Sequence, residues 1–173
     1  MLRRPVVTGD AAADAAGQPG TYVLVVRSPA TGAVRVGRLG SLALDGRWLL
    51  YVGSALGPGG LRARVGRHVA GARAVHWHVD RLLRSAEVVE VWLGPGEGRR
   101  EESWARTLRA APGASVPLPG FGASDCGCAG HLVAFEARPR VQEFRGWLRE
   151  AGAEVGKLVA VKGSRRLGTV FGR

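Results

Sequence analysis

The stretch LLYVGSALGPGGLRARVGRH, residues 49–68, joins an apolar strand to a basic helix through a glycine-rich bend. Glycine lets a backbone turn sharply and approach a ligand closely, and the helix that follows carries arginine side chains. A bend of this kind beside a row of cations is suited to binding a negatively charged group. The stretch therefore predicts an anion-binding site between a strand and a helix.

The helix expected over residues 61–72 has one apolar stripe, because apolar residues recur every four positions at Leu61, Val65 and Val69. At about 100° per residue, Arg64 and His68 fall at the edge of this stripe, and Arg67 points nearly opposite, to solvent. Side chains at the edge of a packed face can line a cleft. We therefore expect Arg64 and His68 to face the same cleft.

Three strands are expected around the opening stretch, at residues 21–28, 33–44 and 47–53, because these runs are apolar, β-branched or alternating. Asp45 and Gly46 form a hairpin turn signal before the third strand. The short connections predict an antiparallel meander. Tyr22 lies on the first predicted strand and Tyr51 on the third, so the two phenol rings are expected on neighbouring strands.

The remaining periodicity predicts helices at residues 77–86, 101–111 and 139–152, and strands at 87–94 and 131–137. The resulting fold class is α/β, with a small antiparallel β-sheet flanked by helices. Residues 1–18 have no periodicity and are expected to be a mobile leader. The main domain is expected over residues 19–136, followed at 137–173 by a C-terminal helix and a basic tail.

The composition favours a nucleic-acid partner, because 25 Lys and Arg residues against 14 Asp and Glu residues leave a net charge of +11. The sequence has neither a signal-like apolar stretch at its start nor an apolar run of about 20 residues that would span a membrane. We therefore expect a cytoplasmic protein without a membrane partner. Cys126 and Cys128 are separated by one residue, so a disulfide between them is not expected.

The order of Tyr22, Tyr51, Arg64 and His68 resembles the GIY-YIG nuclease superfamily. The runs YVGSALGPGGLRARVGRH, HWHVDRLL, EESWARTL and FGASDCGCAGHL resemble, more specifically, a branch of it catalogued as a domain of unknown function. The resemblance extends over residues 20–136. It implies the sheet-and-helix fold above and hydrolysis of a phosphodiester bond of DNA, with DNA repair as an expected setting.

The resemblance also implies roles for single residues. The catalytic set would be Tyr22, Tyr51, Arg64 and His68. Glu102 would hold a divalent metal, Mg²⁺ or Mn²⁺, and Glu101 is its competitor as ligand. Arginine offers a planar fork to phosphate oxygens, and tyrosine could take a proton from water if nearby cations favour its phenolate. In the bend and at the helix start, phosphate or DNA contacts are expected from Gly57, Gly59, Gly60 and Arg62.

Two alternatives stay open on the sequence alone. Nuclease members commonly have a downstream asparagine in the site, and this chain contains no Asn, which favours a DNA-binding module that kept the fold without cleavage. A second cluster offers ligands that could hold zinc, most of them borderline or soft: His76, His78, Asp80, Cys126, Cys128 and His131. It would support a zinc-stabilised adaptor for a protein partner that the sequence does not identify.

Overall fold

The computed structural model describes residues 9–71 and 74–172, and its centre is a six-stranded antiparallel sheet. The strand order is β6-β7-β4-β1-β5-β8. From one edge of the sheet to the other, these strands are β6 Ala114–Ser115, β7 Leu132–Phe135, β4 Trp48–Ala55, β1 Gly20–Arg27, β5 Glu87–Pro95 and β8 Val159–Lys162. The β-branched and apolar β1 is central and buried almost along its whole length.

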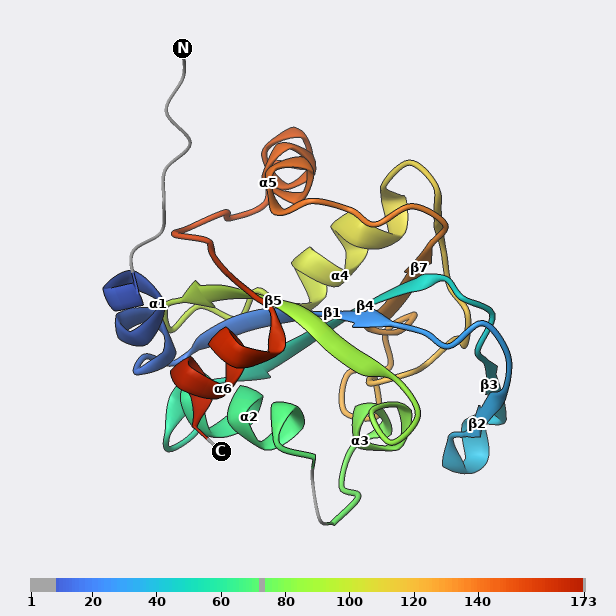
Figure 1. The fold of residues 1–173 in the computed structure, drawn as a ribbon. Helices are drawn as coiled ribbons and strands as arrows, with labels where there is room; N and C mark the ends of the chain where they lie inside the picture. The colour runs from blue at the N-terminus through green and yellow to red at the C-terminus, as the bar shows by residue number, and fades with distance from the viewer. Residues whose placement is uncertain (1–8, 72–73, 173) are drawn as a thin grey trace.

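Helices cover both faces of this sheet (Figure 1). One face, which carries Tyr22, Leu24 and Val26 of β1, packs against α1 Gly9–Ala16, α2 Gly60–Val69, α3 His78–Leu82 and α6 Ser164–Phe171. The other face, which carries Val23 and Val25, packs against α4 Glu101–Ala110 and α5 Val141–Glu150. Successive side chains of β1 thus point to opposite faces of the sheet and pack into two separate apolar cores. The predicted α/β class with flanking helices is confirmed.

The predicted meander differs from the observed connection between the first and third strands. Residues 33–44 do not enter the main sheet, because β2 Ala33–Arg35 and β3 Ser41–Ala43 pair only with each other as a two-stranded sheet. A 3-10 turn, Gly37–Leu39, joins them. β1 consequently pairs directly with β4, and Tyr22 and Tyr51 are brought onto adjacent strands, as predicted.

Both ends of the described chain contain more structure than the sequence predicted. Within the expected leader, α1 buries Ala12, Ala15 and Ala16 against the sheet core, whereas residues 1–8 lie outside the described residues. Within the expected basic tail, β8 adds an edge strand beside β5, and α6 packs on α2. The C-terminal segment therefore completes one face of the sheet.

In the part of the chain that the structure describes, none of the helices has the length and apolar character needed to cross a membrane. The cytoplasmic location stays a prediction from the sequence.

Candidate functional site

The two tyrosines are positioned by the pairing of β1 with β4. Tyr22 lies opposite Gly53, and Leu24 lies opposite Tyr51. The ring centroids of Tyr22 and Tyr51 are 6.5 Å apart. A Cβ atom on Gly53 would lie 2.3 Å from the Tyr22 hydroxyl oxygen, so the glycine of the YVG run makes room for the other tyrosine.

A buried chain of hydrogen bonds runs from Tyr22 through His68 to Asp80. The Tyr22 hydroxyl oxygen is 2.9 Å from His68 Nε2, and His68 Nδ1 is 3.2 Å from Asp80 Oδ1. Asp80 also accepts the backbone N–H groups of His76 and Trp77 and an N–H of Arg67. Because α2 carries His68 and α3 carries Asp80, this network joins two helices beneath the first tyrosine.

The electrostatics of the chain favour a neutral imidazole and neutral phenols. Burial lowers the pKa of His68 to about 4, against the opposing effect of Asp80. A neutral ring has one N–H, and Asp80 can only accept, so Nδ1 carries the proton and Nε2 accepts the Tyr22 hydroxyl. Burial and the neighbouring Tyr51 raise the pKa of Tyr22 well above its ordinary value, more than Arg64 lowers it.

Tyr51 and Asp80 depart from their ordinary pKa values in opposite directions. Burial and then Glu101 raise the pKa of Tyr51, with Arg64 opposing them. Burial by itself would raise the pKa of Asp80, but the N–H groups that it accepts and the charges of its neighbours outweigh burial and lower this pKa. The condition that nearby cations stabilise a tyrosine phenolate is therefore not met.

A pocket of about 300 Å³ lies beside the tyrosines. We call it the tyrosine pocket and define it by its ionisable lining residues, Tyr22, Tyr51, Arg64, Arg99, Glu101 and Asp125. His68 is not part of this lining and lies behind Tyr22. The expectation that Arg64 and His68 face one cleft therefore holds for Arg64 alone, and His68 acts on the pocket through Tyr22.

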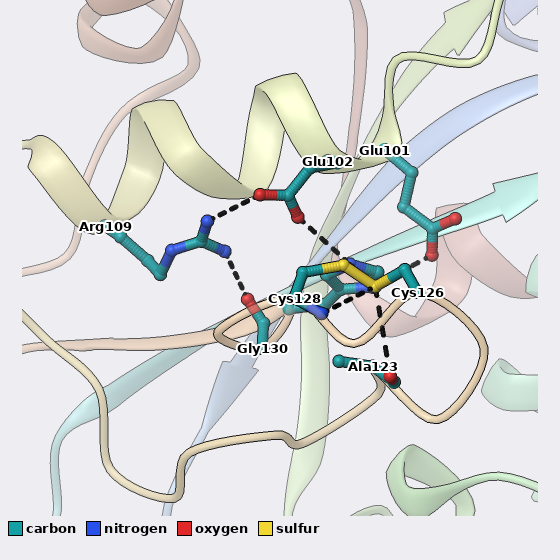
Figure 2. The surroundings of a disulfide bond; sticks show 8 residues. Glu101, Glu102, Arg109, Ala123, Cys126, Cys128 and Gly130 are labelled. Carbon is teal, nitrogen blue, oxygen red and sulfur yellow. Dashed lines mark hydrogen bonds and ion pairs between the residues drawn. A yellow bond between two sulfur atoms is a disulfide. The ribbon is translucent and has the colours of Figure 1, made fainter.

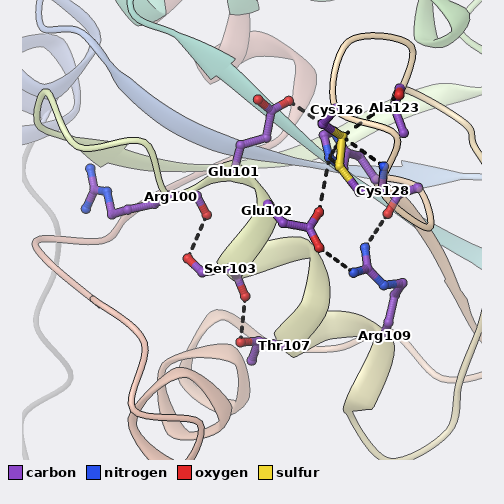
Figure 3. A network of polar contacts seen from close by, with 11 residues as sticks. Arg100, Glu101, Glu102, Ser103, Thr107, Arg109, Ala123, Cys126 and Cys128 are labelled. Atoms are coloured by element: carbon purple, nitrogen blue, oxygen red, sulfur yellow. Dashed lines mark hydrogen bonds and ion pairs between the residues drawn. A yellow bond between two sulfur atoms is a disulfide. The ribbon is translucent and has the colours of Figure 1, made fainter.

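Of the two glutamates at the start of α4, Glu101, the competitor, lines the tyrosine pocket beside Asp125, and Glu102 does not. Both residues lie in the first turn of α4, but the Glu102 carboxylate turns to Arg109, at 2.7 Å, and to His131 Nε2, at 3.5 Å. Figure 3 shows the contact of Glu102 with Arg109 and the hydroxyl groups of Ser103 and Thr107 that bond back along α4. Arg99 and Asp125 are pocket residues that the sequence analysis missed, and only their charge could have indicated them.

The bend of the opening stretch is explained by packing more than by an exposed phosphate cradle. Gly59 and Gly60 have φ angles of +81° and +56°, and a Cβ on Gly60 would lie 2.5 Å from the Gln18 carbonyl oxygen. Gly57 alone of the predicted glycines borders the tyrosine pocket. Arg62 donates to the carbonyl oxygens of Ala13 and Val170, so its guanidinium joins α1 and α6 to α2.

Trp77 organises the arginines of α2. The guanidinium carbons of Arg64 and Arg67 lie 4.3 Å and 4.2 Å from the centroid of its ring. Arg67 is also ion-paired with Asp80, so the prediction that it points to solvent is wrong. A larger cavity of about 540 Å³ between α2 and α6 includes His68 but neither tyrosine, and its lining is mostly small or apolar. It offers fewer convergent polar groups than the tyrosine pocket.

The cysteine loop forms a second group of chemically active side chains beside the start of α4. Cys126 and Cys128 are joined by a disulfide in the structure, which corrects the expectation that they are not (Figure 2). His131 Nε2 is 3.7 Å from each sulfur atom. The ligand atoms of Glu102, Cys126, Cys128 and His131 all lie within 4.8 Å of one another, and we call these residues the loop cluster.

The two upstream histidines expected in a zinc site lie elsewhere among the described residues. His78 Nδ1 accepts the backbone N–H of Gly122, and the ring of His76 packs against Trp77. Burial and then Arg81 lower the pKa of His78. The loop cluster thus contains three residues of the predicted zinc site, Cys126, Cys128 and His131. Its fourth residue is Glu102, which the sequence predicted as the ligand of Mg²⁺ or Mn²⁺ in the nuclease site.

Comparison with known proteins gives one finding. A family model described as domain of unknown function DUF123 matches residues 21–152. No curated protein and no solved structure matches the chain.

Proposed function

The chain belongs to the DUF123 family of domains of unknown function, and we propose that its tyrosine pocket is the active site of a metal-dependent DNA endonuclease of GIY-YIG type. The observation that carries this proposal is the convergence of Tyr22, Tyr51, Arg64 and Glu101 on one pocket, from β1, β4, α2 and α4. The net charge of +11 supports DNA as the substrate.

Arg64 is the residue that would bind the scissile phosphate. It borders the pocket, and the ring of Trp77 holds its guanidinium in place. A planar guanidinium can donate two parallel N–H groups to phosphate oxygens. Arg99, which is exposed at the rim, adds a second cation along the path of a DNA backbone.

Tyr22 would take the proton from the attacking water through a concerted transfer. Because its hydroxyl donates to His68 Nε2, the Tyr22 oxygen can accept a proton from water while its own proton moves to His68. The imidazolium that forms then faces the Asp80 carboxylate. This relay needs no free phenolate, so it agrees with the raised pKa of Tyr22.

The donor set of the pocket fits a hard divalent cation. Glu101 and Asp125 both supply carboxylate oxygens, which Mg²⁺ and Mn²⁺ prefer over nitrogen or sulfur. When bound, such a cation supplies positive charge to the leaving oxygen. Of the two carboxylates, Glu101 is the better anchored, because its Oε1 atom lies 3.1 Å from His131 Nδ1.

Cleavage of plasmid, branched and damaged DNA with Mg²⁺, Mn²⁺ or EDTA tests the proposal. We expect metal-dependent nicking that Glu101→Gln lowers by at least about 100-fold while DNA binding is retained, because only the carboxylate charge is lost. Arg64→Ala should weaken both binding and cleavage. Glu97→Gln removes an exposed carboxylate just before α4 and serves as the matched control.

A DNA-binding module without cleavage is the second candidate, favoured by the absence of asparagine from the chain. It predicts wild-type protein that binds DNA in all three conditions and cuts none of the substrates. Undiminished cleavage by Glu101→Gln would instead support the nuclease activity and show that Glu101 is not its metal ligand.

A further inference from the structure

We propose that the loop cluster is a Zn²⁺ site in the reduced protein, with Glu102, Cys126, Cys128 and His131 as its ligands. This site is separate from the tyrosine pocket and does not depend on nuclease activity. Its carboxylate ligand is Glu102 of α4, which does not line the tyrosine pocket.

The three distances from His131 Nε2 to the other ligand atoms of the loop cluster agree with tetrahedral coordination. His131 Nε2 lies 3.7 Å from both sulfur atoms and 3.5 Å from Glu102 Oε2. Zinc bonds of about 2.0 to 2.3 Å in a tetrahedron put neighbouring ligand atoms roughly 3.3 to 3.8 Å apart. Three of the ligand–ligand distances are therefore those that a zinc ion between the atoms requires.

The cluster also directs acceptor atoms toward one point. Glu102 Oε2 is buried and has no hydrogen-bond partner among the described residues. It faces His131 Nε2, which in a neutral ring protonated at Nδ1 is an acceptor as well. Once the disulfide is reduced and the two thiols lose their protons, two thiolates would face these acceptors, and a cation between the four groups would offset their repulsion. A bound Zn²⁺ would remove this conflict.

Neighbouring residues supply the outer contacts that a zinc site needs. Nδ1 of His131 lies 3.1 Å from Glu101 Oε1, at ion-pair distance though not aligned as a hydrogen bond. Arg109 donates to the other oxygen of Glu102 and also to the Gly130 carbonyl oxygen (Figure 2). The backbone N–H of Cys128 points at Cys126 Sγ, at 3.4 Å. Such contacts orient ligating histidines and carboxylates toward a metal.

The ligand types select zinc over the harder cations. Two thiolates with an imidazole and a carboxylate favour Zn²⁺ over Mg²⁺ and Mn²⁺. Four protein ligands complete a tetrahedron and leave no open position, so the site would be structural. It would hold the loop of residues 122–131 against the start of α4, and Gly122 of this loop packs against the Tyr51 ring.

Reduction of the disulfide is the step that creates the site. Two molecules of a thiol reductant donate two electrons and two protons: the Cys126–Cys128 S–S bond breaks, two cysteine thiols form, and the reductant becomes a disulfide. Binding of Zn²⁺ then replaces the two thiol protons, which go to solvent. The same two cysteines would therefore constrain the loop in either state, by a disulfide when oxidised and by a shared zinc ion when reduced.

Cobalt substitution in the full-length protein tests this inference directly. The protein is first reduced with a monothiol, and the monothiol is then removed in the absence of oxygen. Titration with Co²⁺ should produce thiolate charge-transfer bands and tetrahedral d–d bands that saturate at one equivalent of thiolate-bound Co²⁺ per chain. Zn²⁺ should displace Co²⁺ and erase the bands. The disulfide form should show neither the charge-transfer bands nor the d–d bands when Co²⁺ is added. Reduced protein that shows no such bands and retains no Zn²⁺ would overturn the proposal.

Variants connect the signal to its ligands. Cys126→Ser, Cys128→Ser and Glu102→Gln should each weaken Zn²⁺ binding by at least about 100-fold, and Glu101→Gln by about 10- to 100-fold, because it acts through His131. Glu97→Gln, which removes an exposed carboxylate outside both the loop cluster and the tyrosine pocket, should bind Zn²⁺ as wild type does. Circular dichroism checks that each variant is folded. Folded cysteine variants with unchanged affinity would contradict the assignment.

Discussion

The imidazole of His68 is the buried group that gives the site its own pH response. Its pKa is about 4 in the folded protein, against about 6.5 in an unfolded chain. Between these values the unfolded state binds more protons than the folded state, so the free energy of unfolding falls as the pH drops from 7 to 4. We expect His68 to account for a loss of roughly 3 kcal/mol at most.

Urea unfolding at pH 7.0 and pH 4.5, in wild type and His68→Gln, measures this contribution. The variant has no titrating group at this position, so it should lose less stability over the interval. Asp80 titrates below its ordinary range and contributes little at these pH values. Equal pH dependence in the two proteins would show that His68 is not held neutral by burial.

Glu101 and Glu102 show what a sequence leaves undecided at the scale of one residue. The acidic first turn and the apolar stripe of Trp104, Ala105 and Leu108 predict α4 correctly. Neighbouring side chains on a helix point about 100° apart, so one can face the tyrosines while the other faces the cysteine loop. Which one does so depends on the rotation of α4 on the sheet, and this is fixed by tertiary packing.

Arg62 works at the scale of helices, because its guanidinium holds three of them together. It donates to Val170 O of α6 at 2.8 Å and to Ala13 O of α1 at 3.1 Å. Arg62→Met keeps much of the apolar stem and loses both hydrogen bonds. We expect the free energy of unfolding to fall by about 1 to 2 kcal/mol, with DNA affinity nearly unchanged.

Denaturant unfolding and a DNA-binding assay on the same variant separate these roles. Arg106→Met, at an exposed position of α4, is the control for loss of a surface arginine. A loss of DNA affinity comparable to that of Arg64→Ala, without loss of stability, would restore the phosphate contact that the sequence predicted for Arg62.

The elements predicted from the sequence are those with strong periodicity. The predictions found β1, β4, β5, β7, α2, α3, α4 and α5, whereas β8 was not predicted although it is as long as β7. α6 did carry a signal, since Leu167, Val170 and Phe171 have helical spacing and are buried. The β2–β3 hairpin shows a different limit, because alternation predicts strands but not their partners.

At the scale of the whole molecule, the two faces of the sheet differ in what they carry. The face that packs against α1, α2, α3 and α6 carries the tyrosines, and His68 of α2 lies against it, whereas α4 and α5 cover a second apolar core. α4 contributes to both sides, since its buried residues join the second core while Glu101 reaches the tyrosine pocket. The start of α4 is therefore where the pocket and the loop cluster meet.

The excess of 25 basic over 14 acidic residues, a net charge of +11, predicts how DNA affinity depends on salt. Each phosphate contact releases bound counterions, so the logarithm of the affinity should fall linearly with the logarithm of the salt concentration, by about 0.9 per contact. Contacts by Arg64, Arg99 and at least one further cation would give a slope of about −3 or steeper. Titrations of duplex DNA from 50 to 200 mM salt, roughly the range in which such losses are large, measure it.

Substitutions decide whether this charge acts at the tyrosine pocket or over the whole surface. Arg64→Ala should reduce the slope by about 1, because one phosphate contact is lost. Arg149→Gln removes an exposed cation from α5, on the opposite face of the sheet, and should leave the slope unchanged. If both substitutions reduced the slope equally, DNA would bind the basic surface without preference for the pocket. A wild-type slope near zero would exclude electrostatic DNA binding altogether, and with it the reason to expect DNA as the substrate.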